Sequence, residues 1–297
     1  MKPNNQMEFQ KFVGIDWSGA KKSDNLRVAV CESGKSAPKL KGDGWNRDEL
    51  VEWIIREANS QPTLIGIDFA FAYPYLDKGA YFPGLAESPK SAFQLWSTID
   101  KICHSDQHLY AGSFYKDRST PFSDYFCYQD EARLRYDSSR FRETECKVFE
   151  EFNTRPSCVF KCVGPDQVGP GSVAGMRALN SIITTNSGNI SIWPFESISE
   201  SNSVIVEIFP RIFFTYAREN PQKWKDINVV NAVLKHFNSG PLGFDFDPSS
   251  KYAEDKIDAI VSAAALRELS LRSKIWQPKS LTKSVRKYEG WIFGCTL

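Results

Sequence analysis

Apolar and polar positions alternate between distinct patterns along the first part of the chain. Residues 11–18 (KFVGIDWS) begin with a nearly continuous apolar run, as in a strand that is buried on both faces. Residues 26–33 (LRVAVCES) alternate like a half-exposed strand, and the charged residues before them predict a turn. Residues 37–44 (APKLKGDG) predict a short third strand. This pattern favours three consecutive strands.

A predicted helix and a returning strand follow these three strands. Residues 46–60 carry apolar side chains at helical spacing behind Asn46, a residue type that caps helix N-termini well. Residues 63–72 (TLIGIDFAFA) again predict a buried strand. Crossover connections between parallel strands are right-handed, so we expect the returning strand beside the first. The pattern therefore predicts a mixed α/β sheet.

The two buried strands share the ending Gly-Ile-Asp. It places Asp16 at the end of the first strand and Asp68 at the end of the returning one. Ligands of open α/β sheets bind beyond the carboxyl ends of the strands, so neighbouring strands would bring both acids to one edge. A single aspartate there often only caps a turn. Two at matching ends favour a functional pair, because like charges held close are costly without a cation.

The middle of the chain, residues 71–202, lacks a regular strand–helix alternation. It predicts a long, mainly helical or irregular insertion that forms a cap subdomain over the strand edge, within a single domain spanning residues 1–297. Aromatic and Arg residues interleave here, and two interpretations stay open: they stack bases and grip phosphates, or they pack an irregular subdomain. These residues are Phe114, Tyr115, Arg118, Tyr125, Tyr128, Arg133, Arg135, Tyr136, Arg140 and Arg142.

A glycine-rich turn within this region predicts the start of a helix near Ser172. The first N–H groups of a helix are free to bind anions, so Ser172 is a candidate phosphate contact. Arg177 lies on the same predicted helix and is a second candidate. The glycine spacing matches neither a Walker loop nor a dinucleotide-binding fingerprint.

The C-terminal third returns to regular patterns. Residues 202–210 (NSVIVEIFP) predict a buried strand with Glu207 near its end, followed by a short helix that carries Arg211. Glu207 is thus a third candidate strand-end carboxylate. Residues 289–294 (EGWIFG) predict an additional edge strand.

A strong helix is predicted over residues 252–272. Its acids Asp255 and Asp258 are three positions apart and therefore share a face. Asp255 alone fits the helix dipole in a first turn, whereas Asp258 lies between two isoleucines. Small side chains would let this helix press on a sheet and bring its acids to the strand ends. They are Ala259, Ala263 and Ala264.

Composition narrows the class of protein. A net charge of +1 excludes a protein that coats nucleic acid by charge alone, but it is compatible with an enzyme that has a local basic groove. No apolar stretch is long enough for a membrane helix, and the N-terminal residues lack a signal core. Seven cysteines favour reduced thiols. We expect a soluble, cytoplasmic protein with no membrane partner.

A zinc site is a lesser alternative for part of the chain. Cys and His are zinc ligands, but their spacings here differ from those of zinc fingers, and a strand that packs its thiols is the simpler interpretation. The residues concerned are Cys103, His104, His108, Cys158 and Cys162.

The order of FVGIDWSGA, LIGIDFAFAYP, GSVAGM, WPFE, VEIFPR, DKIDAIVSAAAL and EGWIFG, from about residue 12 to 294, resembles the "domain of unknown function" family numbered 429. That family is regarded as ribonuclease H-like and is often labelled a predicted nuclease. The resemblance implies a ribonuclease H-like mixed sheet flanked by helices, with an acid on the first strand, the fourth strand and the last helix. It implies no particular substrate. The matching positions are Asp16, Asp68 and Asp258, with Asp255 and Glu207 as helpers.

These residue types suit metal-dependent phosphodiester chemistry. Mg²⁺ and Mn²⁺ prefer oxygen ligands, and two such ions about 4 Å apart activate water and stabilise a leaving oxygen. We therefore expect a nuclease or phosphodiesterase with nucleic acid as its partner. The candidate metal ligands are Asp16, Asp68, Asp255 and Asp258, the candidate catalytic residues are Asp16, Asp68, Glu207 and Asp258, and the candidate phosphate or substrate contacts are Ser18, Ser172, Arg177 and Arg211.

Two alternatives come from other functional classes. The first is a nucleotide hydrolase or phosphotransferase of the actin and sugar-kinase type, whose first phosphate loop GIDWSG resembles; the second Gly-Ile-Asp, however, follows too soon for a duplicated domain. The second is a catalytically inactive module that binds nucleic acid or protein through the aromatic, Arg-rich segment.

Overall fold

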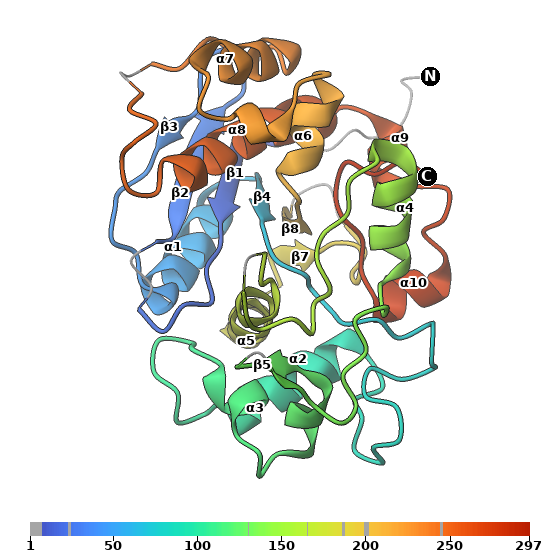
Figure 1. Ribbon diagram of the computed structural model, residues 1–297. Coiled ribbons are helices and arrows are strands. Elements are labelled where there is room, and N and C mark those ends of the chain that lie inside the picture. Colours follow the sequence, from blue (N-terminus) through green and yellow to red (C-terminus); the bar gives the residue numbers. More distant parts are fainter. Residues whose placement is uncertain are drawn as a thin grey trace.

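The computed structural model describes residues 8–22, 25–129, 131–164, 166–185, 188–198, 202–243 and 246–297. A six-stranded sheet of order β3-β2-β1-β4-β8-β7 lies between helices (Figure 1). Its strands are β1 (Lys11–Asp16), β2 (Arg27–Glu32), β3 (Lys39–Leu40), β4 (Thr63–Ile67), β7 (Ile190–Ile192) and β8 (Ser203–Glu207). The predicted mixed α/β sheet flanked by helices is confirmed.

The sheet is antiparallel on one side of β1 and parallel on the other. β1 pairs antiparallel with β2, β2 with β3, and β1, β4, β8 and β7 run parallel to one another. The returning strand therefore lies beside the first, as predicted. The carboxyl ends of β1, β4 and β8 consequently meet at one edge of the sheet.

The helices include three long ones that matter for this edge. They are α1 (Arg47–Ser60), which begins behind an Asn46 capping box as predicted, α5 (Gly169–Thr185) and α8 (Ala253–Leu269). The others are α2 (Ala92–Ile102), α3 (Gly112–Lys116), α4 (Glu143–Phe152), α6 (Arg211–Tyr216), α7 (Ile227–His236), α9 (Ser273–Trp276) and α10 (Lys283–Tyr288), with 3-10 turns η1 (Pro121–Tyr125) and η2 (Pro221–Lys223) and a small hairpin of β5 (Cys127–Tyr128) and β6 (Glu131–Ala132).

Alternate side chains of each strand enter two separate apolar layers, as the period of a strand requires. On one face Val13 and Ile65 pack with α1, α2 and α5. On the other face Phe12 and Leu64 pack with α6, α7 and α8. The fold is therefore a three-layer α/β/α arrangement (Figure 1).

Gly14 explains why α8 lies so close to the sheet. A Cβ atom at Gly14 would stand 2.2 Å from the Ala259 carbonyl oxygen and 2.7 Å from the Ala263 nitrogen, both in the backbone of α8. The predicted small-residue face of this helix thus meets the strand exactly where the strand has no side chain. This close approach fixes how far the acids of α8 stand from the strand ends.

Two predicted boundaries differ from the structure. The segment 71–202, expected to be an inserted cap, contains β7, which is the edge strand of the main sheet. Residues 289–294 form no strand: only Ile292 makes an isolated bridge, parallel to Glu207, because the chain turns away at once.

Among the described residues no helix is long and apolar enough to cross a bilayer. Residues 1–7, which belong to the N-terminus discussed above, lie outside the described part.

The Arg-rich middle segment is mostly a packed subdomain. Phe114, Tyr115 and Tyr125 are buried. Arg140 is 5% exposed and donates to the Asp77 carboxylate at 2.7 and 2.9 Å and to backbone carbonyls. Its neighbours in the segment behave similarly, since Arg133 donates to two carbonyls and Arg135 to the Tyr125 hydroxyl. These arginines stabilise loops rather than presenting a phosphate-gripping surface.

Substitution of Gly14 by Ala should destabilise the protein by about 2–4 kcal/mol, because a new methyl group meets the backbone of α8, which cannot rotate away. Urea unfolding of the purified variant measures this. Gly243→Ala is the matched control, since nothing lies within 4 Å of its added Cβ, and it should change the free energy of unfolding by less than about 0.5 kcal/mol. Equal stability of the two variants would contradict the close contact.

Candidate metal and phosphoester site

Asp16 and Asp68 lie side by side at the carboxyl edge of the sheet. Ile15 pairs with Ile67 in the parallel register of β1 and β4, and the Asp68 N–H donates to the Ile15 carbonyl at 3.0 Å. Neighbouring strands are about 4.8 Å apart, so the backbones of the two acids are separated by about that distance. The prediction that the Gly-Ile-Asp repeats end at one edge is confirmed.

Helix α8 adds Asp255 and Asp258 to the same edge. Burial raises the pKa of Asp16 well above its ordinary value, and the charges of Asp255, Asp258 and Asp68 raise it further. Burial likewise raises the pKa of Asp258, helped by Asp68, Glu254 and Asp255. Four carboxyl groups from two strands and one helix therefore act on one another electrostatically.

Asp68 is the acid of the cluster whose pKa lies in the neutral range. Burial, followed by the charge of Glu207, raises its pKa to about 7, against a smaller opposing effect of Arg211. Part of the Asp68 population is therefore protonated near neutral pH in the metal-free protein. A bound cation would favour the charged form.

Three carboxylates of the cluster have no hydrogen-bond donor among the described residues. Within the part of the chain that the structure describes, Asp16, Asp68 and Asp258 accept no hydrogen bond and form no ion pair. Their oxygens are hard donors of the kind that Mg²⁺ and Mn²⁺ prefer, so the donor set fits such an ion. Among the same described residues, no group of three or more His, Cys, Asp or Glu side chains is already arranged to hold a metal ion. Metal binding would require side-chain rotation.

Two arginines, Arg27 and Arg211, lie near the acid cluster and partly offset its negative charge. Burial raises the pKa of Asp255, and Arg27 lowers it. Arg27 likewise lowers the pKa of Asp16, against burial. Arg27 is the residue opposite Asp16 in β2, and its guanidinium lies 4.3 Å from the centre of the Tyr252 ring. Arg211 lowers the pKa of Asp68 and of Asp258, against the dominant effect of burial.

Glu207 has a different role from the one expected. The sequence predicts a free carboxylate that helps a second ion or orients water. Instead, Arg142 donates to both oxygens, at 2.5 and 2.8 Å, and the Phe71 N–H donates to Oε2 at 3.0 Å. Glu207 is 2% exposed and Arg142 1% exposed. The pair ties the insertion to the end of β8, and Glu145 completes the neutralisation of Arg142.

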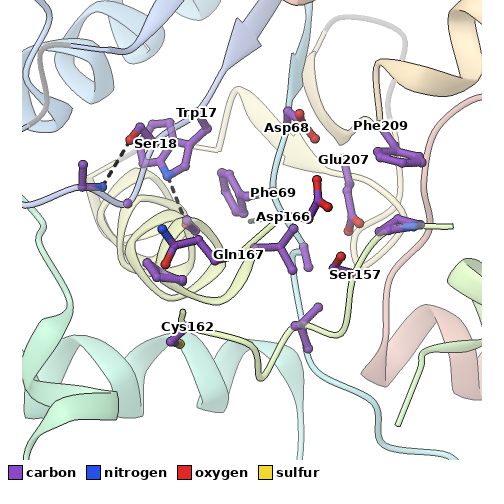
Figure 2. A pocket seen from close by; sticks show the side chains of 18 of the residues that line it. Trp17, Ser18, Asp68, Phe69, Ser157, Cys162, Asp166, Gln167, Glu207 and Phe209 are labelled. Atoms are coloured by element: carbon purple, nitrogen blue, oxygen red, sulfur yellow. Dashed lines mark hydrogen bonds between the residues drawn. The ribbon is translucent and has the colours of Figure 1, made fainter. Parts of the chain in front are cut away.

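A cavity of about 720 Å³ opens beside the acids. Figure 2 shows Asp68 and Glu207 on one side of it and Trp17, Ser18 and Cys162 on the other, with Phe69 between them. Asp258, Glu254 and Arg211 also line it. Small-ligand pockets commonly have about 300–1,000 Å³, so this one has the size of a ligand site.

The predicted substrate contacts separate into two groups. Ser18 and Arg211 line the cavity, and Arg211 pairs at 3.3 Å with Asp166, itself part of the lining. Ser172 does not reach it: its hydroxyl donates to the Val168 carbonyl and accepts from the Ala70 N–H. Arg177 is buried and donates to Asp100 at 2.9 Å, so it stabilises the insertion instead.

The loop after β1 packs against the start of α5. A Cβ atom at Gly19 would stand 2.1 Å from the Pro170 backbone, and the Trp17 indole donates to the Gly171 carbonyl at 3.1 Å. The Ser18 hydroxyl accepts from the Ala20 N–H (Figure 2). This packing fixes the loop against the start of α5, while Ser18, Gly19 and Ala20 still line the cavity.

The zinc alternative finds no support in the described residues, in which no Cys or His belongs to a group able to hold a metal ion. His108 pairs with Asp48 at 2.9 Å, and the Cys158 thiol donates to backbone carbonyls. All seven cysteines are free.

Sequence reasoning missed two members of the site. Glu254 lies one helical turn before Asp258, and that i, i+4 spacing was a usable signal. Arg142 stood out only as one of the interleaved arginines of the insertion; its pairing with Glu207 carried no signal, because only the folded insertion brings the two together across 65 positions.

Comparison of the chain with protein-family models, with curated proteins and with solved structures gives no match.

Asp68→Asn should remove a pH-dependent destabilisation. The folded-state pKa of Asp68 is raised to about 7. Its carboxyl group is therefore neutral and costs no stability below pH 4, and it destabilises the fold increasingly as the pH rises through 7. Without metal, the variant should therefore gain on the order of 3 kcal/mol over wild type at pH 8 and almost nothing at pH 4. Urea unfolding at both pH values measures the difference.

The same experiment with added Mn²⁺ tests the ion. Mn²⁺ should stabilise wild type at pH 8 in proportion to the logarithm of its concentration, and stabilise the variant much less. A stability difference that is independent of pH, or equal metal responses, would contradict the analysis of Asp68.

Arg142→Met should cost about 3–5 kcal/mol of stability, because it leaves the buried Glu207 charge without its partner. Lys147→Met is the control, since it breaks an exposed ion pair with Glu150 and should cost less than about 1 kcal/mol. A small loss in Arg142→Met would mean that Glu207 does not depend on Arg142 as its partner. Chemical unfolding at pH 7 checks both variants.

Proposed function

We propose that this protein is a metal-dependent phosphodiester hydrolase, a nuclease or phosphodiesterase in the wide sense. The observation that carries the proposal is the group of carboxyl groups at one sheet edge, Asp16, Asp68, Asp255 and Asp258, beside a ligand-sized cavity. Burial raises the pKa of all four, and the neighbouring acids raise those of Asp16 and Asp258 further. Like charges held together where water is partly excluded destabilise the fold, and a bound divalent cation would neutralise their repulsion.

Asp16, Asp68 and Asp258 would hold Mg²⁺ or Mn²⁺, with Asp255 available beside Asp16 for a second ion. A bound divalent ion supplies a water of lowered pKa and stabilises charge on a phosphoester oxygen. Hydrolysis of a phosphodiester would add water to phosphorus and release an alcohol, leaving a phosphate monoester.

The remaining residues of the site bind and orient. Arg211 stands beside Asp68 and Asp258 and is half-exposed, so its guanidinium can exchange Asp166 for a substrate phosphate. The buried Arg142–Glu207 pair fixes the end of β8 next to Asp68. Trp17 and Phe69, whose ring centres lie 5.3 Å apart, form an apolar wall that limits water around the acids.

The resemblance to ribonuclease H-like nucleases points the same way. In that pattern the acids lie on the first strand, the fourth strand and the last helix. Here Asp16 ends β1, Asp68 directly follows β4, and Asp258 lies on α8, the last long helix. We therefore extend the proposal to a ribonuclease H-like ancestry of the sheet.

Asp16→Asn should lower Mn²⁺-dependent hydrolysis of bis(p-nitrophenyl) phosphate and of labelled single-stranded DNA and RNA at least about 100-fold, because it removes a metal ligand. The variant should stay folded, since it also removes like-charge repulsion. Glu87→Gln, an exposed carboxylate outside the cavity, is the control and should keep full activity.

Full activity of Asp16→Asn would overturn the assignment. Absence of hydrolysis in wild type, with nucleic-acid affinity retained, would instead identify an inactive binding module. Turnover of ATP that depends on Asp16 would identify a nucleotide hydrolase.

A further inference from the structure

The cavity wall carries both acids and cations. Arg142 is neutralised by Glu207 and Glu145, and Arg211 pairs with Asp166. Once these pairs are set aside, three acids remain from the end of β4 and from α8, and three cations remain from other segments of the chain. The acids are Asp68, Glu254 and Asp258, and the cations are Lys21, Lys116 and Arg155.

Lys116 is the most enclosed of these cations. It ends α3 in the insertion, is half-buried, and pairs with no carboxylate among the residues that the structure describes. Its ammonium nitrogen lies 5.3, 5.5 and 5.1 Å from the ring centres of Tyr110, Tyr115 and Tyr128. All four side chains line the cavity. Burial lowers the pKa of Lys116, and interaction with the Tyr110 and Tyr128 side chains raises it, so the tyrosines orient and stabilise the ammonium without a carboxylate partner in the described part of the chain.

This aromatic and cationic corner lies away from the acid cluster. Burial raises the pKa of the Cys162 thiol and Lys116 opposes that effect, so Lys116 stands near Cys162. Figure 2 shows Cys162 across the pocket from Asp68 and Glu207. A ligand that touches both Lys116 and the acid cluster must therefore extend along the cavity.

A third feature of the wall is an unused acceptor. The Asn25 side-chain oxygen is buried, lines the cavity, and has no hydrogen-bond partner among the described residues. Buried acceptors without a partner are rare, and an N–H or O–H group of a ligand would satisfy this one. Base amino groups and sugar hydroxyls are donors of that kind.

The size of the cavity restricts the substrate. A volume of about 720 Å³ holds a small molecule or a short chain end, and the insertion forms part of its wall. A net charge of +1 gives the protein no overall excess of positive charge of the kind that binds a long nucleic acid by charge alone. Both facts favour a short strand over a duplex.

From these observations we infer a second subsite around Lys116, which binds an additional phosphate of a short single-stranded oligonucleotide, with the Tyr128 ring against a base. This rests on the proposed hydrolysis, since it assumes that the reacting phosphoester lies at Asp16, Asp68 and Asp258. The subsite makes substrates with a second phosphate better than minimal phosphodiesters.

The test compares three substrates with Mn²⁺: bis(p-nitrophenyl) phosphate, a 5′-phosphorylated dinucleotide, and a blunt duplex of the same sequence repeated. Lys116→Ala should raise the KM for the phosphorylated dinucleotide at least ten-fold with kcat little changed, and should leave the minimal ester unaffected. Lys116→Arg should restore most of the affinity, because it keeps the charge. Lys101→Ala, an exposed lysine outside the cavity, is the control.

Binding measured without turnover separates the two proposals. In the Asp16→Asn background, a fluorescent 5′-phosphorylated dinucleotide should bind at least ten-fold more weakly when Lys116 is also replaced by Ala or Gln. If wild type hydrolyses nothing but this loss is seen, the subsite stands and the hydrolase proposal fails. If hydrolysis is robust but Lys116 variants bind and turn over the dinucleotide like wild type, or the duplex is the best substrate, the subsite is overturned.

Discussion

The contact between Gly14 and α8 is the constraint on which the site depends. A helix packs on a sheet at a distance set by the side chains between them, and at Gly14 the strand contributes none. The α8 backbone consequently approaches β1 closely enough for Asp255 and Asp258 to act on Asp16, although more than 200 positions of sequence separate them. Without this approach the strand-end acids would form only a pair. The repeated glycine of Gly-Ile-Asp is therefore as much a part of the site as the aspartate.

The acid cluster is an electrostatic liability that the surrounding structure only partly relieves. Arg27 faces Asp16 and Asp255 from the antiparallel side of the sheet, and Arg211 faces Asp68 and Asp258 from the start of α6, yet burial still dominates each pKa. If the proposed cation binds here, it would relieve this repulsion, and metal binding would then be coupled to stability. This coupling is the physical reason for treating the cluster as functional rather than as a set of helix and turn caps.

The insertion contributes to the site through buried arginines rather than through a basic surface. Arg140 joins loop residues through Asp77, Arg142 ties the insertion to the end of β8, and Arg177 ties α5 to α2. Planar, permanently charged donors suit this use, since one side chain satisfies several carbonyls and a carboxylate at once. The cost is that each carboxylate so used, including Glu207, is withdrawn from chemistry. The few cations left over, Lys116 foremost, become the informative ones.

Sequence by itself determined the strand–helix–strand opening, the common edge of Asp16 and Asp68, the Asn46 cap and the shared face of Asp255 and Asp258. These follow from local periodicity and from the handedness of a crossover, which operate over short stretches of chain. Tertiary structure alone decided that Glu207 pairs with Arg142, that Ser172 and Arg177 face away from the cavity, and that Lys116 enters it. The reason is that an irregular segment has no period to report which way a side chain points; its partners are set by long-range packing and by the need to satisfy every buried charge.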